Sequence, residues 1–188
     1  MKKRFVMACM SSLLLVSSIN AFASGAGAGN NFVLNLIGTG PMYEDLVPDI
    51  DGDGVDDPAI CFDVDLVDMQ KGQTVGTATD CLSDLTPIGT GVALVGTTYF
   101  NFPQGELVER AKTTLQHAQK QTDRDSGEVM THITGAASPQ NAVISRTRQY
   151  AGQEGTVRLS GMVDMSAFEG NVGDPISFDC LFFVDLSN

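Results

Sequence analysis

Residues 60–82 constrain the fold more than any other part of the chain, because the two halves of this segment match each other about Lys71. A three-residue loop of Gln70, Lys71 and Gly72 would place glycine where a type I turn followed by a left-handed residue needs it. Counting outward from this loop sorts the side chains into one mostly polar face and one mostly apolar face. This period of two is typical of a half-buried antiparallel hairpin, in which a slip of one residue would turn every side chain to the wrong face.

The same count predicts a complete pairing register for the hairpin, starting with Met69 opposite Gln73. The predicted pairs are Val67 with Val75, Asp65 with Thr77, Asp63 with Thr79 and Cys61 with Cys81 on the polar face, and Leu66 with Gly76, Val64 with Ala78, Phe62 with Asp80 and Ile60 with Leu82 on the apolar face. Directly opposed cysteines in a non-hydrogen-bonded pair lie at a separation that a disulfide accepts. We therefore expect a Cys61–Cys81 disulfide.

Cys180 is the third cysteine of the expected mature chain. It shares one face of residues 175–186 with apolar side chains, so we expect a buried core thiol. The alternative is pairing with a second chain, because an odd cysteine in a secreted protein can form an intermolecular bridge.

The N-terminus predicts a secretory signal peptide over residues 1–23. Three basic residues open the chain, residues 5–16 are largely apolar, and residues 21–23 form a small-x-small cleavage site. The apolar run is too short to span a bilayer. We expect a secreted or periplasmic protein with no membrane attachment after cleavage.

Net charge limits the partners of such a mature chain. Cleavage would remove three of the 11 basic residues and none of the 23 acidic ones, which leaves a formal charge of −15. Nucleic acids and anionic membrane surfaces are therefore excluded as natural partners. The remaining length, about 165 residues, is enough for one domain with a core.

After the first hairpin the chain alternates between apolar strands and short turns, and no stretch shows a sustained helical period. The loop of Pro103, Gln104 and Gly105 repeats the three-residue pattern and predicts three pairs: Phe100 with Val108, Tyr99 with Glu109, and Thr98 with Arg110. Between residues 60 and 186 eight strands are predicted, over residues 60–69, 73–82, 92–102, 107–115, 129–135, 142–151, 156–165 and 176–186. Hairpin-length connections indicate an up-and-down barrel or a strongly coiled sheet. We expect an all-β, eight-stranded antiparallel barrel, because closing the last strand on the first would remove both sheet edges.

The barrel domain is predicted over residues 60–188, after two shorter segments. Residues 24–31 have the composition of a flexible tether, and residues 32–59 hold a strand at 32–37 followed by an acidic loop. An eight-stranded barrel of this kind leaves room for one small ligand.

The acidic loop is the most specific chemical signal in the chain. Its spacing matches the front of a calcium loop of the kind used by EF-hands and thrombospondin type 3 repeats, with Asp49, Asp51, Asp53, the carbonyl of Val55 and Asp57 as ligands and Gly54 at the bend. Ile60 stands at the twelfth position, where a bidentate carboxylate belongs, so another acidic residue would complete the shell. A structural Ca²⁺ is expected here; the alternative is a solvated acidic turn without an ion.

Several strands together resemble a known family. The segments GTATDC, TTYFNFPQGELVERAKTTLQ, THITGA, YAGQEGTVRLSGMVDMS and ISFDCLFFVDL are similar to the allene oxide cyclase and dirigent barrels, and especially to their secreted bacterial relatives, over roughly residues 61–186. The resemblance implies a calycin-like barrel that binds a hydrophobic or phenolic small molecule and, in some members, guides its cyclisation or stereoselective coupling. Glu154 stands where dirigents carry a site arginine, which reverses the charge at that position.

The predicted facing of side chains nominates candidate catalytic residues. Asp80 falls among apolar side chains, where burial would raise its pKa and suit it to act as an acid or base; the alternative is a carboxylate that reaches water at the barrel rim. Tyr99 opposite Glu109 would orient a ligand hydroxyl, unless the two form a surface pair. Arg110 would bind an acidic ligand, with a solvent-directed side chain as the alternative.

Apolar ligand contacts are expected from Phe62, Phe100, Phe178 and Phe182, which share the inward face of the predicted strands. His117 and His132 have no partners at metal-ligand spacing.

Two hypotheses for the function follow from the candidate site residues. The first is a barrel that encloses a small hydrophobic ligand and can guide its reaction, with association into a homo-oligomer as a further expectation from the family. The second is a non-catalytic extracellular barrel with a filled interior, whose calcium loop or rim contacts another protein.

Overall fold

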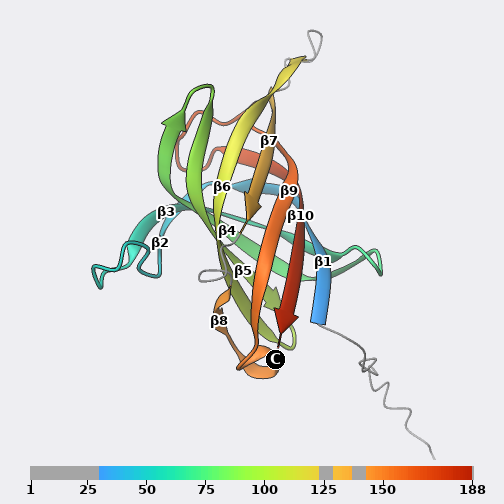
Figure 1. Ribbon diagram of the computed structural model, residues 1–188. Coiled ribbons are helices and arrows are strands. Elements are labelled where there is room, and N and C mark those ends of the chain that lie inside the picture. The colour runs from blue at the N-terminus through green and yellow to red at the C-terminus, as the bar shows by residue number, and fades with distance from the viewer. Residues whose placement is uncertain (1–29, 123–128, 137–142, 188) are drawn as a thin grey trace, which may run out of the picture.

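The computed structural model describes residues 30–122, 129–136 and 143–187 (Figure 1). The predicted signal peptide lies outside these residues. The strands are β1 (Asn30–Pro41), β2 (Tyr43–Val47), β3 (Asp57–Asp68), β4 (Gln73–Ile88), β5 (Gly91–Phe102), β6 (Gly105–Thr122), β7 (Val129–Ala136), β8 (Val143–Arg146), β9 (Glu154–Asp164) and β10 (Pro175–Ser187), with one short 3-10 helix, η1 (Arg148–Tyr150). Within the described part of the chain, no helix has the length and apolarity needed to cross a membrane.

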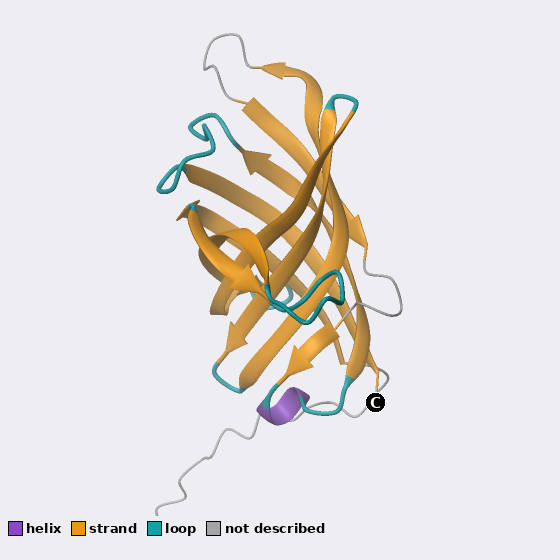
Figure 2. Cartoon of the chain, turned by 90° about the vertical axis from the view of Figure 1, so that its left-hand side faces the viewer, coloured by secondary structure: helices purple, strands orange, loops and turns teal. Residues whose placement is uncertain are grey.

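The strands form a closed antiparallel barrel of eight strands with two additional strands, β2 and β8, attached to it (Figures 1 and 2). Around the barrel the order is β1, β10, β9, β7, β6, β5, β4 and β3, and β3 pairs again with β1. The predicted fold class and number of strands are therefore confirmed.

One predicted member of the barrel is wrong. Of the strand predicted at 142–151, residues 143–151 are described, and they form only the short strand β8 and then η1, because Arg148 adopts a left-handed φ of 51° that ends the extended chain. The eighth position is taken by β1, which lies between β10 and β3. The last strand thus closes on β1 and not on β3. Asn30 and Asn31 already belong to β1, so the segment predicted as a tether ends earlier than residue 31.

The predicted register of the first hairpin is confirmed over seven pairs, from Ile60–Leu82 to Leu66–Gly76. A β-bulge after Leu66 then shifts the pairing, so that Asp68 faces Gln73 and the loop has four residues instead of three. The Asp68 carboxylate explains this turn, because it accepts hydrogen bonds from the backbone N–H groups of Gln70 and Lys71. Gly72 has a φ of 63° at the end of the loop, as predicted for the left-handed residue.

The predicted register of the second hairpin is wrong by one residue. The turn has two residues, Pro103 and Gln104, and Phe102 pairs with Gly105. Gly105 therefore lies outside the turn. Glycine is needed at this position because a Cβ there would lie 2.6 Å from the carbonyl oxygen of Thr147. Because of this one-residue difference in register, Glu109 points into the barrel and Arg110 points out of it.

The barrel interior holds the main apolar core. Phe62, Phe100, Phe178 and Phe182 are all buried, with ring centroids 5.4 Å apart for the Phe62–Phe178 pair and 5.3 Å apart for the Phe100–Phe182 pair. These four rings occupy much of the space that the sequence alone assigns to a ligand.

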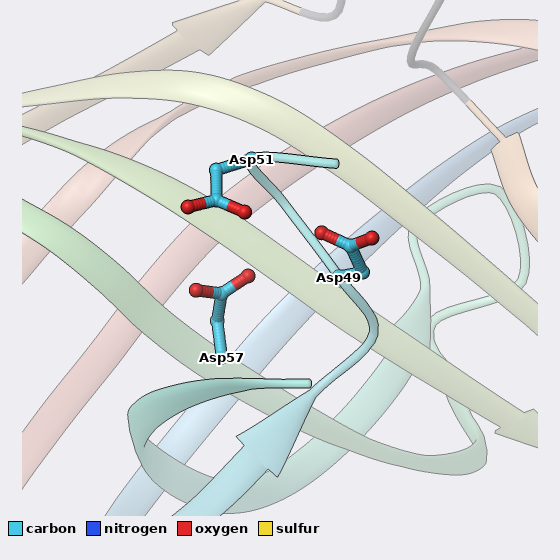
Figure 3. A group of neighbouring side chains, drawn as sticks. All are labelled: Asp49, Asp51 and Asp57. Atoms are coloured by element: carbon cyan, nitrogen blue, oxygen red, sulfur yellow. The ribbon is translucent and has the colours of Figure 1, made fainter. Parts of the chain in front are cut away.

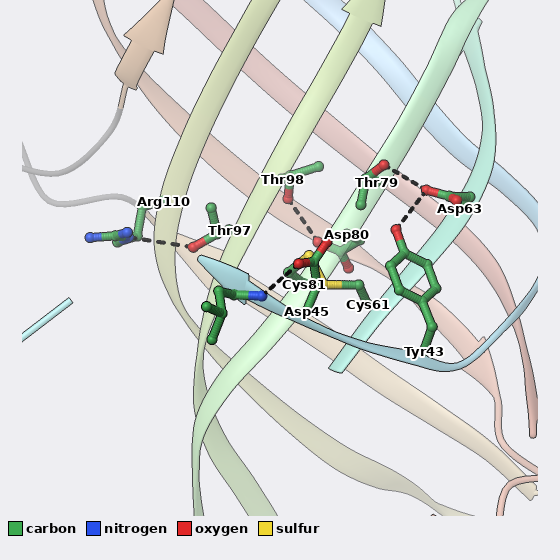
Figure 4. The surroundings of a disulfide bond; sticks show 11 residues. Tyr43, Asp45, Cys61, Asp63, Thr79, Asp80, Cys81, Thr97, Thr98 and Arg110 are labelled. Atoms are coloured by element: carbon green, nitrogen blue, oxygen red, sulfur yellow. Dashed lines mark hydrogen bonds between the residues drawn. A yellow bond between two sulfur atoms is a disulfide. The ribbon is translucent and has the colours of Figure 1, made fainter. Parts of the chain in front are cut away.

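A second, smaller core lies on the outer face of the barrel. Val47 and Ala59, from β2 and β3, pack there with the two cysteines, and Tyr43 and Tyr99 lie against this cluster. Figure 4 shows the surroundings of the disulfide. The Cys61–Cys81 disulfide is confirmed, with the two Cα atoms 4.1 Å apart as in a closely spaced antiparallel pair.

Candidate functional site

One polar row crosses the inside of the barrel on four adjacent strands. Phe62 on β3 faces Asp80 on β4, Asp80 faces Thr98 on β5, and Thr98 faces Glu109 on β6. Paired residues of neighbouring strands point to the same side of a sheet. Asp80 and Glu109 are therefore held inside the barrel, and they expose only 4% and 1% of their surface.

Hydrogen bonding in this row is incomplete. The Thr98 hydroxyl donates to Oδ1 of Asp80 at 2.8 Å (Figure 4). Oε2 of Glu109 is buried and has no hydrogen-bond partner among the described residues. A buried polar group without a partner costs about 1–3 kcal/mol. The row therefore contains an acceptor or donor that a bound molecule could satisfy.

The two carboxyl groups have different proton affinities. Burial raises the pKa of Asp80 to about 6, against the opposing effect of the Thr98 hydrogen bond. Burial raises the pKa of Glu109 to about 8; the Thr98 hydroxyl opposes this, and the negative charge of Asp80 adds to it. Near pH 7 the row then holds an ionised Asp80 beside a protonated Glu109. One group can accept a proton or hydrogen bond and the other can donate one.

Cys180 lies in the interior near this row. Burial, and next the charge of Asp80, raise the pKa of its thiol to about 12. Gly161 pairs with Cys180 on β9, and a Cβ at Gly161 would lie 2.8 Å from the sulfur atom. Cys180 is thus the buried, unbridged core thiol that the sequence predicts, and its protonated state makes it a poor nucleophile.

Tyr99 and Arg110 do not share this interior. Tyr99 lies on the outer face and packs against the disulfide cluster; burial raises its pKa, partly offset by the positive charge of Arg110. Arg110 donates to the backbone carbonyls of Pro48 and Asp49. It also donates to the Thr97 hydroxyl (Figure 4). The predicted interior positions of both residues are wrong. Arg110 points outward because the register of the second hairpin differs by one residue from the predicted one, and Tyr99 points outward because it is next to the inward Phe100 on β5.

The acidic loop joins β2 to β3 and gathers three carboxylates. Oxygen atoms of Asp49, Asp51 and Asp57 all lie within 4.8 Å of one another (Figure 3). The Asp53 carboxylate accepts a hydrogen bond from the backbone N–H of Val55 instead of joining this group. Three converging carboxylates are an oxygen donor set that fits a hard cation such as Ca²⁺.

Backbone hydrogen bonds shape the loop around Asp49. Both of its carboxylate oxygens accept, one from Gly52 at 2.6 Å and one from Gly54 at 2.9 Å. The bonds from Gly54 and Gly52 lower the pKa of Asp49. The loop is anchored to the barrel through Arg110, which binds the Asp49 carbonyl at 2.9 Å.

Neither histidine joins a metal-ligand cluster in the part of the chain that the structure describes. His132 lies on the exposed face of β7, and the only group of three candidate ligands there is the aspartate set. The side chain of His117 lies outside what the structure describes.

The sequence does not predict the interior partnership of Thr98 and Glu109. The signal is weak because residues 107–111, LVERA, place apolar side chains at both odd and even positions. Only the turn length could fix which set points inward.

No protein-family model matches this chain, and no curated protein matches it either.

Proposed function

We propose that this barrel binds a small, largely apolar molecule that carries a hydrogen-bond donor, such as a hydroxyl or phenol group. The observation that carries the proposal is the interior row of Asp80, Thr98 and Glu109, with a buried carboxyl oxygen that lacks a partner among the described residues. Asp80 would accept a hydrogen bond from the ligand. Glu109, protonated near pH 7, would donate one to it or exchange a proton with it.

Energetics favour a binding role for these acids over a purely structural one. Two carboxyl groups in one buried row are costly, and an apolar core of the same shape would be at least as stable. A barrel that needed only a filled interior would gain nothing from this arrangement. The polar row therefore supports recognition of a specific chemical group.

The aromatic residues limit the size of such a ligand. Phe62, Phe100, Phe178 and Phe182 already contact one another in pairs. A ligand beside Asp80 would be compact, and these rings would turn to admit it.

On the catalytic version of the proposal, the likeness to allene oxide cyclase and dirigent barrels gives the reaction class. Asp80 would remove a proton from the ligand and Glu109 would return one during ring closure. The net change is an isomerisation that needs no oxidant. Tyr99 and Arg110 would take no part, because both lie on the outer face.

Binding of p-cresol, with toluene as the control of similar shape without a hydroxyl, tests the proposal. We expect p-cresol to shift the methyl resonances of Val64 and Leu82, neighbours of the row on β3 and β4, at concentrations where toluene does not. The substitutions Asp80→Asn and Glu109→Gln should weaken p-cresol binding about tenfold or more, with retained folding checked by thermal melting. Equal binding of the two probes would rule out recognition through the acids.

A second candidate function is favoured by the packed phenylalanines. They support a non-catalytic extracellular barrel whose loops contact another protein. Native mass spectrometry of protein purified from its own host separates the two candidates. A retained small molecule supports the first; a bare chain that also fails to bind p-cresol supports the second.

We also propose that Asp49, Asp51 and Asp57 hold a structural Ca²⁺, with Asp53 and the Val55 carbonyl completing the loop predicted by the sequence. Calcium would offset the repulsion among carboxylates and fix the β2–β3 hairpin. Addition of Ca²⁺ should raise the thermal midpoint, a chelator should lower it again, and Asp51→Asn should remove the response. Asp65→Asn, an exposed change on β3, is the matched control. A midpoint that is insensitive to both additions would contradict the site.

The charge and the disulfide support the remaining proposals. A disulfide persists in oxidising compartments, so we propose a secreted or periplasmic location. Association into a homo-oligomer stays a proposal based on the family likeness alone.

A further inference from the structure

The wall of the barrel opens between β3 and β4 at one end. The ladder that joins these strands stops at the Ile60–Leu82 pair, and no described pair joins them beyond it. β3 continues there as Asp57–Ala59, paired on its other side with β2, while β4 continues into Ser83. The gap is a groove of about 610 Å³, lined by residues of β2, β3 and β4. Its two sides are strand edges that do not pair with each other.

The β4 side of the groove has two unusual features. Ser83 lines it, exposes only 2% of its surface, and its hydroxyl oxygen has no hydrogen-bond partner among the described residues. Asp84 follows in a β-bulge with a positive φ of 52°, a conformation that is costly for a residue other than glycine. A strained, unsatisfied strand edge is typical of a binding site.

The side chains around the groove combine apolar surface with negative charge. Leu46 and Leu85 are 59% and 50% exposed although both are large and apolar. Glu44, Asp45 and Asp84 supply three carboxylates, and none of the ten described residues that line the groove is basic. A complementary molecule would alternate apolar groups with positive charges.

We propose that this groove binds an extended, basic and apolar peptide segment of a partner protein. The segment adds as a strand along the open edge of β4 or β3, as peptides do when they extend a sheet. Alternate side chains of a strand point to opposite sides. One set therefore packs on Leu46 and Leu85 while the other reaches the carboxylates. The Ser83 hydroxyl gains a backbone partner.

This site is separate from the interior row and from the acidic loop. Leu82 lines the groove, whereas Asp80, two residues earlier on β4, Thr98 and Glu109 are not among its lining residues. The inference does not require that the barrel binds a small molecule or calcium.

Fluorescence anisotropy with labelled six-residue peptides tests the proposal on the full mature chain. The probe alternates valine and lysine. One control alternates serine and lysine and has the same charge, and another alternates valine and glutamate. We expect the valine–lysine peptide to bind at least about tenfold more tightly than either control, which is a difference of about 1.4 kcal/mol. Equal binding of the two lysine peptides would reduce the interaction to non-specific charge attraction and overturn the proposal.

Variants and a modified peptide locate the site and its mode. We expect binding to weaken several-fold in the double variant Asp45→Asn, Asp84→Asn and also in the single variant Leu85→Ser. The control Asp185→Asn, at an exposed residue of β10, should leave binding unchanged. Ser83→Ala removes a hydroxyl that has no partner among the described residues, so it should preserve the fold and still weaken binding. The same peptide with alternate N-methylated amides cannot form ladder bonds and should lose affinity. Unchanged affinity on N-methylation, or in all groove variants, would contradict strand addition at this groove.

Discussion

The two hairpins of the barrel wall, β3–β4 and β5–β6, look alike in sequence but differ in how much their sequences specify. Each has a polar turn that ends in a glycine. In the first, seven predicted pairs are present; in the second, all three predicted pairs are displaced by one residue.

The difference comes from what covers the outer face. Outward residues of the first hairpin, such as Asp63 and Asp65, are exposed and polar, so the alternation marks the inner face clearly. In the second hairpin the outward Thr97 and Val108 are as buried as the inward Thr98. Where both faces are covered, side-chain polarity no longer indicates register, and the turn decides it.

The most direct test of the facing assigned to the second hairpin is a substitution on the inward face of β5. Phe100→Ala should destabilise the protein by about 3–5 kcal/mol, because it removes a fully buried ring that packs on Phe182. Phe183→Ala, at a ring 43% exposed on β10, is the control and should cost much less. Urea unfolding measures both. Similar losses for the two variants would mean that the assigned facing is wrong.

A covalent bridge distinguishes the first hairpin from the second. The Cys61–Cys81 disulfide closes a loop with a sequence separation of 20 residues, for which chain entropy predicts a stabilisation of about 3 kcal/mol. The double substitution Cys61→Ala and Cys81→Ala should lower the free energy of unfolding by about that amount. Cys180→Ala, a change to the buried free thiol, tests whether the loss is specific to the bridge. A double variant as stable as the native chain would show that packing of the β2–β3 hairpin alone holds this region.

The two turn glycines should respond unequally to alanine. Gly72 needs its positive φ, but no atom lies within 4 Å of the position that a Cβ would take, so Gly72→Ala should cost about 1 kcal/mol. Gly105 has a φ of 151° and would also bring its Cβ against the Thr147 carbonyl, so Gly105→Ala should cost about 2–4 kcal/mol. Chemical denaturation of the two single variants gives the comparison. An equal cost would imply that Gly105 serves only as a turn residue.

Much of the fold can be predicted from the sequence, and the errors have physical causes. Alternation predicts the strand type, the first register and the disulfide. The sequence pattern leaves β1 outside the barrel, because nothing local in residues 32–37 shows that they pair with β10, which lies about 140 residues away in the chain. Strand partners separated by this distance are set by closure of the whole barrel, which no short pattern reports.

The candidate site can be predicted only in part, for the same reason. The well-determined register of the first hairpin places Asp80 inside, and the structure agrees. The facing of Glu109 and Arg110 depends on the second register, so Glu109 faces Thr98 inside the barrel and Arg110 faces Thr97 outside it in the structure. The grouping of Asp49, Asp51 and Asp57 follows from local spacing alone, which needs no register.

The pH dependence of stability at Glu109 tests the interior row directly. The pKa of Glu109 is raised by burial from its ordinary value of 4.5 to about 8 in the folded protein, and that of Asp80 from 3.8 to about 6. Folding thus favours the protonated forms. Their contribution to stability is complete below about pH 4 and is lost as pH rises through about 6 and then about 8.

Glu109→Gln keeps a neutral group of similar shape, so it should change the free energy of unfolding little at pH 5 but make the variant more stable than the native chain at pH 9. Glu106→Gln, at a partly buried acid near the β5–β6 turn, is the control for the loss of one acidic group on the same strand. Urea unfolding at pH 5, 7 and 9 gives these values. If the free energies of unfolding of the native chain and Glu109→Gln change with pH in parallel, Glu109 is in contact with water. The register of β5 and β6, on which the interior row depends, would then be wrong.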